Sequence, residues 1–138
     1  MMLISTKGRY ALRVLADMAA QPGDEFVKLK DVAARQGISE KYLEAIVQTL
    51  VKGGILSGAR GSRGGYRLAR EASQISAWDV LSLTEGSLAS VGCHKEGSQP
   101  CERMADCPST PLWLGLDQLI FTYLSGFSLA DLAQRINA

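Results

Sequence analysis

A glycine-rich turn between two short apolar segments limits the fold of this chain more than any other feature. Residues 55–60 and 66–69 read as two strands, and the residues between them are Gly61-Ser62-Arg63-Gly64-Gly65. Glycine adopts a positive backbone φ at little cost, so this turn can close a tight hairpin. The sequence therefore predicts a small two-stranded sheet in the middle of the chain.

Two short helices are expected just before this hairpin. Residues 30–36 form the first, which Gly37 ends, and the second starts at Ser39 and stops at Gly53-Gly54. The second helix places several apolar residues on one face: Tyr42, Leu43, Ile46, Val47, Leu50 and Val51. Two such helices joined by a Gly-Ile-Ser turn make a helix-turn-helix, and the hairpin after them makes it a winged helix.

Three further helices are expected around this unit. One runs from Ser5-Thr6 to about Ala20, one from Ser76 to about Thr84, and the last opens at Ser128. A longer helix from Pro111 to Ser125 carries an apolar band wider than one face. We expect a second copy of the chain to cover this band; a core helix buried on two sides is the alternative.

The expected fold is thus mainly α with a small β-wing, a winged helix-turn-helix plus a long C-terminal dimerisation helix. It divides into a DNA-binding domain over residues 1–85, a cysteine-bearing loop over residues 86–110, and a dimerisation helix with a C-terminal helix over residues 111–138.

The charge is unevenly distributed along the chain. Residues 1–70 hold twelve Lys and Arg against six Asp and Glu, whereas residues 71–138 hold three against eight. The basic half is suited to a polyanion such as DNA. We expect a cytoplasmic protein with no membrane contact, because there is no signal peptide and no apolar run of about eighteen residues.

The residues expected to contact double-stranded DNA lie in two places. The start of the second short helix should reach base edges in the major groove, and the thin wing should lie along a minor groove. Glu44 can accept a hydrogen bond from a cytosine amino group, although a solvated helix residue is an equal alternative. The candidates are Ser39, Lys41, Tyr42, Glu44, Arg60, Ser62 and Arg63.

All three cysteines of the chain fall in one polar, loop-like stretch. Cys93, Cys101 and Cys107 have the spacing C-x7-C-x5-C, which matches neither a C-x2-C zinc knuckle nor a ferredoxin run. Grouped thiolates suit a soft metal or an iron–sulfur cluster better than the packing of a core. The fourth ligand stays open among a partner residue, water, a small thiol and the side chains of His94, Glu96, Glu102 and Asp106.

The chain resembles the IscR/NsrR/RirA-type (Rrf-two) family of bacterial winged-helix regulators over essentially its whole length. The resemblance rests on the cysteine triplet and on five segments: Thr6-Lys-Gly-Arg-Tyr-Ala11, Gln36-Gly-Ile-Ser39, Tyr42-Leu43-Glu44, Arg60-Gly61 with Gly64-Gly65-Tyr66, and Leu112-Trp113. It implies a homodimer built on the long helix, operator binding by helix-turn-helix and wing, and a [4Fe–4S] or [2Fe–2S] cluster that modulates DNA affinity.

Two family ligands are missing from this sequence. IscR-like members place a histidine ligand three residues after the third cysteine, where this chain has Thr110. NsrR-like members can use an aspartate near the N-terminus of the partner subunit, where this chain has Arg9. The cysteine spacing is closer to that of RirA-like and some NsrR-like proteins, which slightly favours [4Fe–4S].

The leading hypothesis is a DNA-binding transcription regulator, a repressor that senses iron, redox state or nitric oxide through a cluster held by the three cysteines. The alternatives are a regulator that uses the cysteines as a thiol-redox switch or zinc site, and one that is controlled by a protein partner. An enzyme is not expected. Cys93 and His94 could be a nucleophile and a base, but adjacent residues in a loop rarely place their side chains within hydrogen-bond distance, and the sequence indicates no third group to orient the base.

Overall fold

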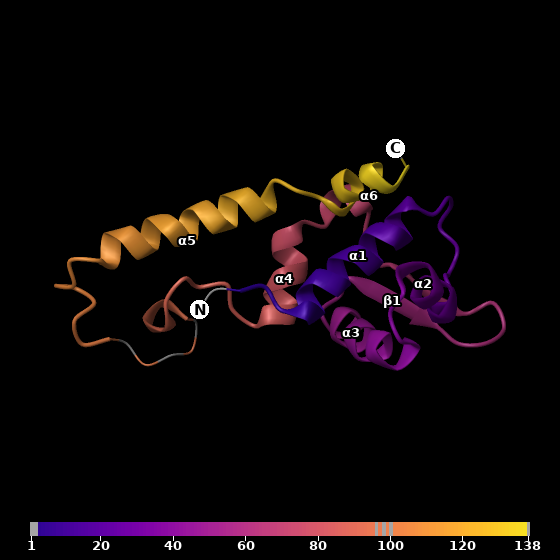
Figure 1. Cartoon of the computed structure of the whole chain (residues 1–138), viewed down its shortest axis with the longest axis horizontal. Helices are drawn as coiled ribbons and strands as arrows, with labels where there is room; N and C mark the ends of the chain where they lie inside the picture. Colours follow the sequence, from indigo (N-terminus) through magenta and orange to yellow (C-terminus); the bar gives the residue numbers. More distant parts are fainter. Residues whose placement is uncertain (1–2, 96, 98, 100, 138) are drawn as a thin grey trace.

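The computed structural model describes residues 3–95, 97, 99 and 101–137. Figure 1 shows a body of helices and a small sheet, from which one long helix extends. In chain order the elements are α1 (Thr6–Ala20), α2 (Leu29–Gln36), α3 (Glu40–Lys52), β1 (Leu56–Ala59), β2 (Gly65–Leu68), η1 (Ala72–Gln74), α4 (Ala77–Glu85), η2 (Gly92–His94), α5 (Thr110–Ser125) and α6 (Leu129–Asn137). The prediction of a mainly α fold with a small β-wing is confirmed.

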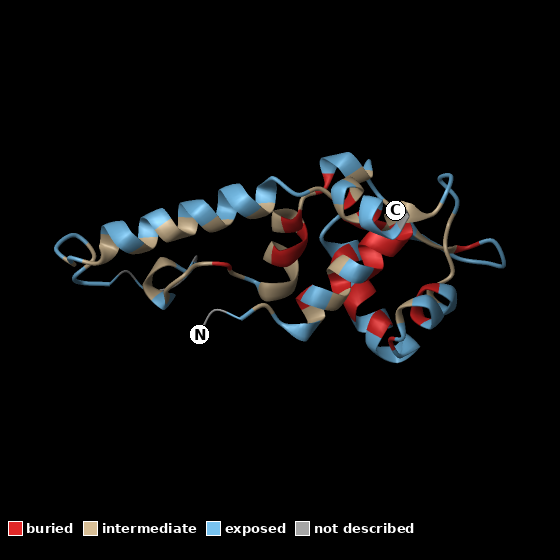
Figure 2. Cartoon of the chain, turned by 45° about the horizontal axis from the view of Figure 1, so that its top comes forward, coloured by how far each residue is buried: buried red, intermediate tan, exposed pale blue. Residues whose placement is uncertain are grey.

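One apolar core holds the body together. The sides of α1 and α3 that face each other supply its centre, and Figure 2 places the buried residues in this part of the molecule. Val14, Leu15, Leu43 and Leu50 are completely inaccessible to solvent. The apolar spacing in the sequence predicted this face of α3, although Tyr42 and Val51 lie at its edge and are each 38% exposed.

Serine side chains start four of the helices, as predicted. Ser5 and Ser39 each accept a hydrogen bond from a backbone N–H of the first turn, Gly8 and Tyr42 respectively. Ser76 forms a complete capping box with Asp79, and Ser128 makes the same reciprocal pair with Asp131. These caps are local, which explains why the sequence alone located the helix starts.

The wing is a two-stranded hairpin to which one residue of the segment before α2 is bridged. β1 and β2 pair antiparallel from Leu56 opposite Leu68 to Ala59 opposite Gly65, so each strand lies within about one residue of its predicted segment. In addition, Val27 and Tyr66 exchange two backbone hydrogen bonds of 2.8 and 2.9 Å. The extended piece before α2 is thereby attached to β2, which fixes the wing to the helix-turn-helix.

A buried carboxylate ties the helix-turn-helix to α1. Asp17, 3% exposed, accepts a hydrogen bond of 2.7 Å from Arg35 and one of 2.8 Å from Gln36. This hydrogen bond to Asp17 raises the pKa of Arg35, against the opposing effect of burial. Arg13 also donates to the Gln36 backbone carbonyl at 2.6 Å. Gln36, the last residue of α2, is therefore bound by side chains from two successive turns of α1, Arg13 and Asp17. It lies directly before the turn to α3.

The helix α5 extends away from the body and carries an uncovered apolar surface (Figures 1 and 2). No residue of α5 is buried, and Leu112, Leu119 and Tyr123 are 63%, 68% and 67% exposed. Its contact with the body is a T-shaped packing of Phe121 on Trp78, with ring centroids 4.9 Å apart. A core helix buried on two sides, the alternative considered for this segment, does not describe this chain.

The last helix, α6, packs back onto α1, where Leu129 is fully buried. The Ile75 carbonyl accepts the Leu129 N–H, so the chain after α5 returns to the body. The division into three parts at residues 85 and 110 stays a prediction. None of the helices in the described part of the chain has the length and apolar character needed to cross a membrane.

Candidate nucleic-acid interface and cysteine loop

The predicted base-reading residues lie together on the exposed N-terminal end of α3. Lys41, Tyr42 and Glu44 are all exposed, and no ion pair engages Lys41 or Glu44 among the residues that the structure describes. Ser39 is exposed too, but its hydroxyl oxygen already caps the helix. The Tyr42 ring packs edge-on against Tyr10, with centroids 5.9 Å apart. This packing orients the tyrosine at the start of the helix.

The predicted wing residues Arg60, Ser62 and Arg63 are likewise exposed, at the tip between β1 and β2. Sequence reasoning missed two cations that support the wing. The Lys28 ammonium donates to the Gly61 carbonyl at 3.4 Å, and Arg67 lies 4.4 Å above the Phe26 ring while donating to the Asp24 carbonyl. The signal available in the sequence was Phe26-Val27-Lys28-Leu29, which reads as a short extended segment and could therefore pair with a strand of the wing.

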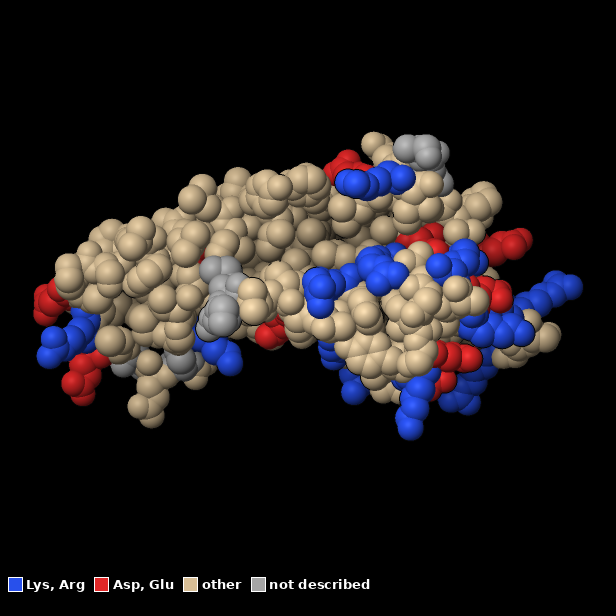
Figure 3. Space-filling model, in the orientation of Figure 1, with Lys and Arg blue, Asp and Glu red and all other residues tan. Residues whose placement is uncertain are grey.

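Positive charge gathers at the end of the molecule that carries the helix-turn-helix and the wing. In Figure 3 the Lys and Arg side chains cluster over this end, whereas the surface along α5 is almost free of charge. The only charged residue of α5 is Asp117. The two halves of the molecule thus present a cationic surface and an apolar surface, which suit different partners.

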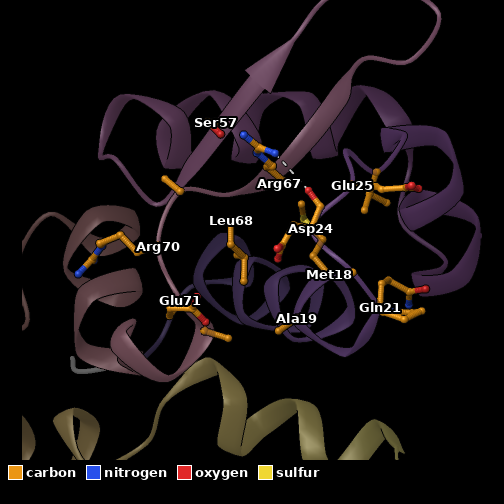
Figure 4. A pocket seen from close by; sticks show the side chains of 15 residues that line it. Met18, Ala19, Gln21, Asp24, Glu25, Ser57, Arg67, Leu68, Arg70 and Glu71 are labelled. Atoms are coloured by element: carbon orange, nitrogen blue, oxygen red, sulfur yellow. Dashed lines mark hydrogen bonds between the residues drawn. The ribbon is translucent and has the colours of Figure 1, made fainter.

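A hollow of about 490 Å³ lies behind the wing, between the end of α1, the loop after it and β2 (Figure 4). Met18, Ala19 and Leu68 form part of its lining, and Arg67 spans it to reach the Asp24 carbonyl. The hollow contains none of the predicted site residues.

The three cysteines are free thiols in the segment between α4 and α5. Cys93 lies in the short turn η2 and is half-buried, Cys101 is exposed, and Cys107 is half-buried just before α5. Hydrogen bonding to Ser109, whose oxygen lies 3.2 Å from the sulfur, lowers the pKa of the Cys107 thiol, and Thr110 acts in the same direction. Cys107 is therefore the thiol whose thiolate form is stabilised by its neighbours.

The structure places the candidates for a fourth ligand differently. The His94 side chain is 7% exposed, and its Nδ1 lies 3.0 Å from an Asp117 carboxylate oxygen. Thr110, at the position of the family histidine, donates its hydroxyl to the Met104 carbonyl. Arg9, at the position of the family aspartate, donates to Thr6. Glu102 and Asp106 are exposed, and Glu96 lies outside the described residues.

The donor chemistry of this loop fits an iron–sulfur cluster. Three unpaired thiols, one with a lowered pKa, are the ligands that iron in such clusters prefers. Within the described residues, however, no three Cys, His, Asp or Glu side chains are gathered as a metal site. The loop would have to draw its cysteines together to hold a cluster.

A helix-turn-helix followed by a wing, with a cationic surface over both, defines a winged-helix DNA-binding protein. Residues 4–135 match the family model Rrf2, described as an iron-dependent transcriptional regulator, and the chain belongs to this family. It is accordingly a transcription regulator of the winged-helix type, and its relatives are regulators rather than enzymes.

Relatives and solved structures agree with this assignment. The chain is 39% identical to protein rrf2 of Nitratidesulfovibrio vulgaris over 95% of its own length and 87% of that protein. It is 36% identical to the HTH-type transcriptional regulator IscR of Aliivibrio salmonicida, over 95% of the chain and 77% of that protein. The structure of CymR, the global cysteine regulator of B. subtilis, matches with a TM-score of 0.78 at 33% identity, covering 98% of each chain.

Proposed function

We propose that this chain is a dimeric cytoplasmic repressor whose affinity for its operator is modulated by an iron–sulfur cluster held by Cys93, Cys101 and Cys107. The observation that carries the proposal is the placement of all three free thiols in the one segment that joins the DNA-binding body to α5. The lowered pKa of Cys107 and the relatives named IscR support it.

Homodimerisation through α5 is part of this proposal. The exposed Leu112, Leu119 and Tyr123 leave an apolar surface that a soluble monomer rarely presents. A second copy offers the same surface, and a two-fold axis would place two recognition helices on one face of a duplex. Operator half-sites one helical turn apart would then match the dimer.

In this proposal the start of α3 reads bases and the wing contacts the backbone and minor groove. The residues at the start of α3 that bind phosphate or base edges are Ser39, Lys41 and Tyr42. The wing residues that lie along the minor groove are Arg60, Ser62 and Arg63. A narrow minor groove has a strong negative potential, which favours arginine there. A cluster, when bound, would join Cys93, Cys101 and Cys107, and this connection would depend on iron and on the redox state. The chain's own part is to transmit the closure of that loop to α5 and so to the spacing of the two α3 helices.

The experiment is an anaerobic purification with an absorbance spectrum and assays of iron and sulfide, followed by operator titration of holo protein, apo protein and Cys101→Ser. We expect a brown protein with matching iron and sulfide and a holo-to-apo difference of about 1–3 kcal/mol, because a ligand shifts an equilibrium only by its differential affinity. Cys101→Ser should behave as apo protein. Equal binding by all three would exclude the cysteines as the sensor.

A second candidate is a thiol-redox switch at the same cysteines. The structure of Staphylococcus aureus CymR in an oxidised form matches this chain with a TM-score of 0.70 at 32% identity, and the lowered pKa of Cys107 favours a reactive thiolate. A colourless protein after anaerobic reconstitution, whose operator affinity changes reversibly with peroxide and dithiothreitol, would select this candidate. Stoichiometric zinc in the same protein would select a zinc site. A protein that shows neither the redox response nor bound zinc would favour control by a protein partner.

Replacing Glu44 with alanine should raise affinity for non-cognate DNA and lower discrimination. A carboxylate facing DNA is repelled unless it accepts a hydrogen bond from a cytosine amino group. We expect the penalty for a mismatch at one base pair to fall by about 1–3 kcal/mol. Titration of cognate and single-mismatch duplexes at fixed salt measures it, with Gln48→Ala, exposed one turn further along α3, as control. A uniform loss on all duplexes would assign Glu44 a structural role.

A further inference from the structure

Both ends of the cysteine loop are attached to the same face of α5. At the first end, the Ser90 backbone N–H donates to Asp117 at 2.7 Å, and the Ser90 hydroxyl lies 3.5 Å from the Trp113 carbonyl. At the other end, Ser109 accepts a hydrogen bond of 3.2 Å from the Trp113 indole and contacts the Cys107 sulfur. Trp113 and Asp117 are four residues apart, so they occupy one face of the helix.

A further attachment at the first end is the pair of His94 and Asp117. The two side chains approach to 3.0 Å, and the imidazole is almost completely shielded from solvent. Burial opposes ionisation of Asp117, but the hydrogen bonds from Ser90 and the contact with His94 outweigh it and lower the pKa of this carboxyl. An ionised carboxylate only accepts hydrogen bonds, so Nδ1 of His94 carries the hydrogen.

We infer that His94 is a positioning residue: with Asp117 it clamps the turn that carries Cys93 onto α5. The turn itself is short, closed by hydrogen bonds from the His94 and Lys95 N–H groups to the Val91 and Gly92 carbonyls. Because Cys93 precedes His94 directly, its position follows that of the clamped imidazole. The clamp makes the Cys93 end of the loop and α5 move as one unit. Its consequence for DNA affinity rests on the function proposed above.

The first test measures the clamp in apo protein, independently of any cluster. In the full chain with Cys101→Ser and Cys107→Ser, Cys93 is the only thiol, and its reaction rate with 5,5′-dithiobis(2-nitrobenzoate) reports how often the turn opens. Asp117→Ala should raise this rate about tenfold, the order expected from losing a hydrogen bond to a charged group. Gln118→Ala, which alters an exposed neighbour on α5, should leave it unchanged.

Two further variants separate the clamp from other effects. Asp117→Asn removes the charge but keeps one acceptor oxygen for the Ser90 N–H, and its amide can donate to Nδ1 in the other neutral tautomer of His94. Its rate should therefore stay within about threefold of the parent, less than a hydrogen bond contributes. If it rises as far as in Asp117→Ala, the charge rather than the clamp controls the thiol and the inference fails. With Cys101 as the only thiol, Asp117→Ala should have no effect; an equal rise there would mean general loosening and would also overturn the clamp.

The second test uses reconstituted holo protein with its three cysteines. Asp117→Ala and His94→Asn should keep wild-type iron and sulfide content, and Asp117→Ala should bring the holo-to-apo ratio of operator affinities close to one. His94→Asn should keep part of that ratio, since the asparagine amide can replace Nδ1 as donor. A third variant, His94→Ala, separates ligation from positioning. Loss of iron in both His94→Asn and His94→Ala would make His94 a ligand and overturn the positioning role. A colourless parent protein would refute the proposed cluster but leave the thiol-rate result standing.

Discussion

Leu119→Lys should convert the protein from a dimer to a monomer and weaken operator binding by about 10²- to 10⁴-fold, because both recognition helices no longer bind as one unit. Leu119 is 68% exposed in a single chain, within an apolar surface along α5 that has no lysine or arginine. In a dimer built on α5 this side chain would be buried. A lysine there would place an unpaired charge in an apolar interface, which is strongly unfavourable.

Light scattering and operator titration measure this result together. The parent should have twice the mass of one 14.8 kDa chain at micromolar concentration, and the variant the mass of one. Gln118→Lys is the matched control, since it adds the same charge at an exposed polar position whose side chain donates to Thr122. A variant that keeps the dimer mass and the operator affinity would exclude α5 as the interface.

Gly64→Ala should disrupt the wing while leaving the helical core folded. A Cβ on Gly64 would collide with the backbone carbonyl of Ala59 in the opposite strand, where no flexible side chain can move aside. Gly65 has a φ of +140°, and a Cβ there would meet the carbonyl of Val27, the residue bridged to Tyr66. Overpacking of this kind costs about 1–3 kcal/mol, and we expect the wing to relieve it by opening the pairing of β1 with β2.

We expect Gly64→Ala and Gly65→Ala to lower operator affinity by about tenfold to a hundredfold, comparable to losing groove contacts worth about 1–3 kcal/mol. Arg63→Ala should weaken binding by a similar amount and reduce its salt dependence, without changing the fold. Gly61→Ala is the control for strain alone, because nothing lies within 4 Å of its Cβ although its φ is +99°. Helical circular dichroism should be the same in all four variants; unaltered operator binding by Gly64→Ala would mean that the wing does not contact DNA.

Local patterns in the sequence predicted a large part of the fold. The serine caps, the glycines that end α2 and form the wing turn, and the apolar face of α3 each depend on residues within a few positions of one another. The resemblance to the Rrf-two family came from motifs spread along the chain, and the match to the Rrf2 family model confirms that resemblance. The candidate DNA-contacting residues came from the same patterns, and the structure places all seven of them on exposed surface.

By itself, then, the sequence determined the helices, the hairpin, the family and the grouping of the cysteines, since local propensity and spacing specify these. Only the tertiary structure decided that Val27 pairs with Tyr66, that α6 lies on α1, and that His94 contacts Asp117 rather than standing free as a ligand. These contacts join residues 23 or more positions apart. Their free energy comes from burial and hydrogen bonds that exist only once the chain has folded, so no nearby sequence signal records them.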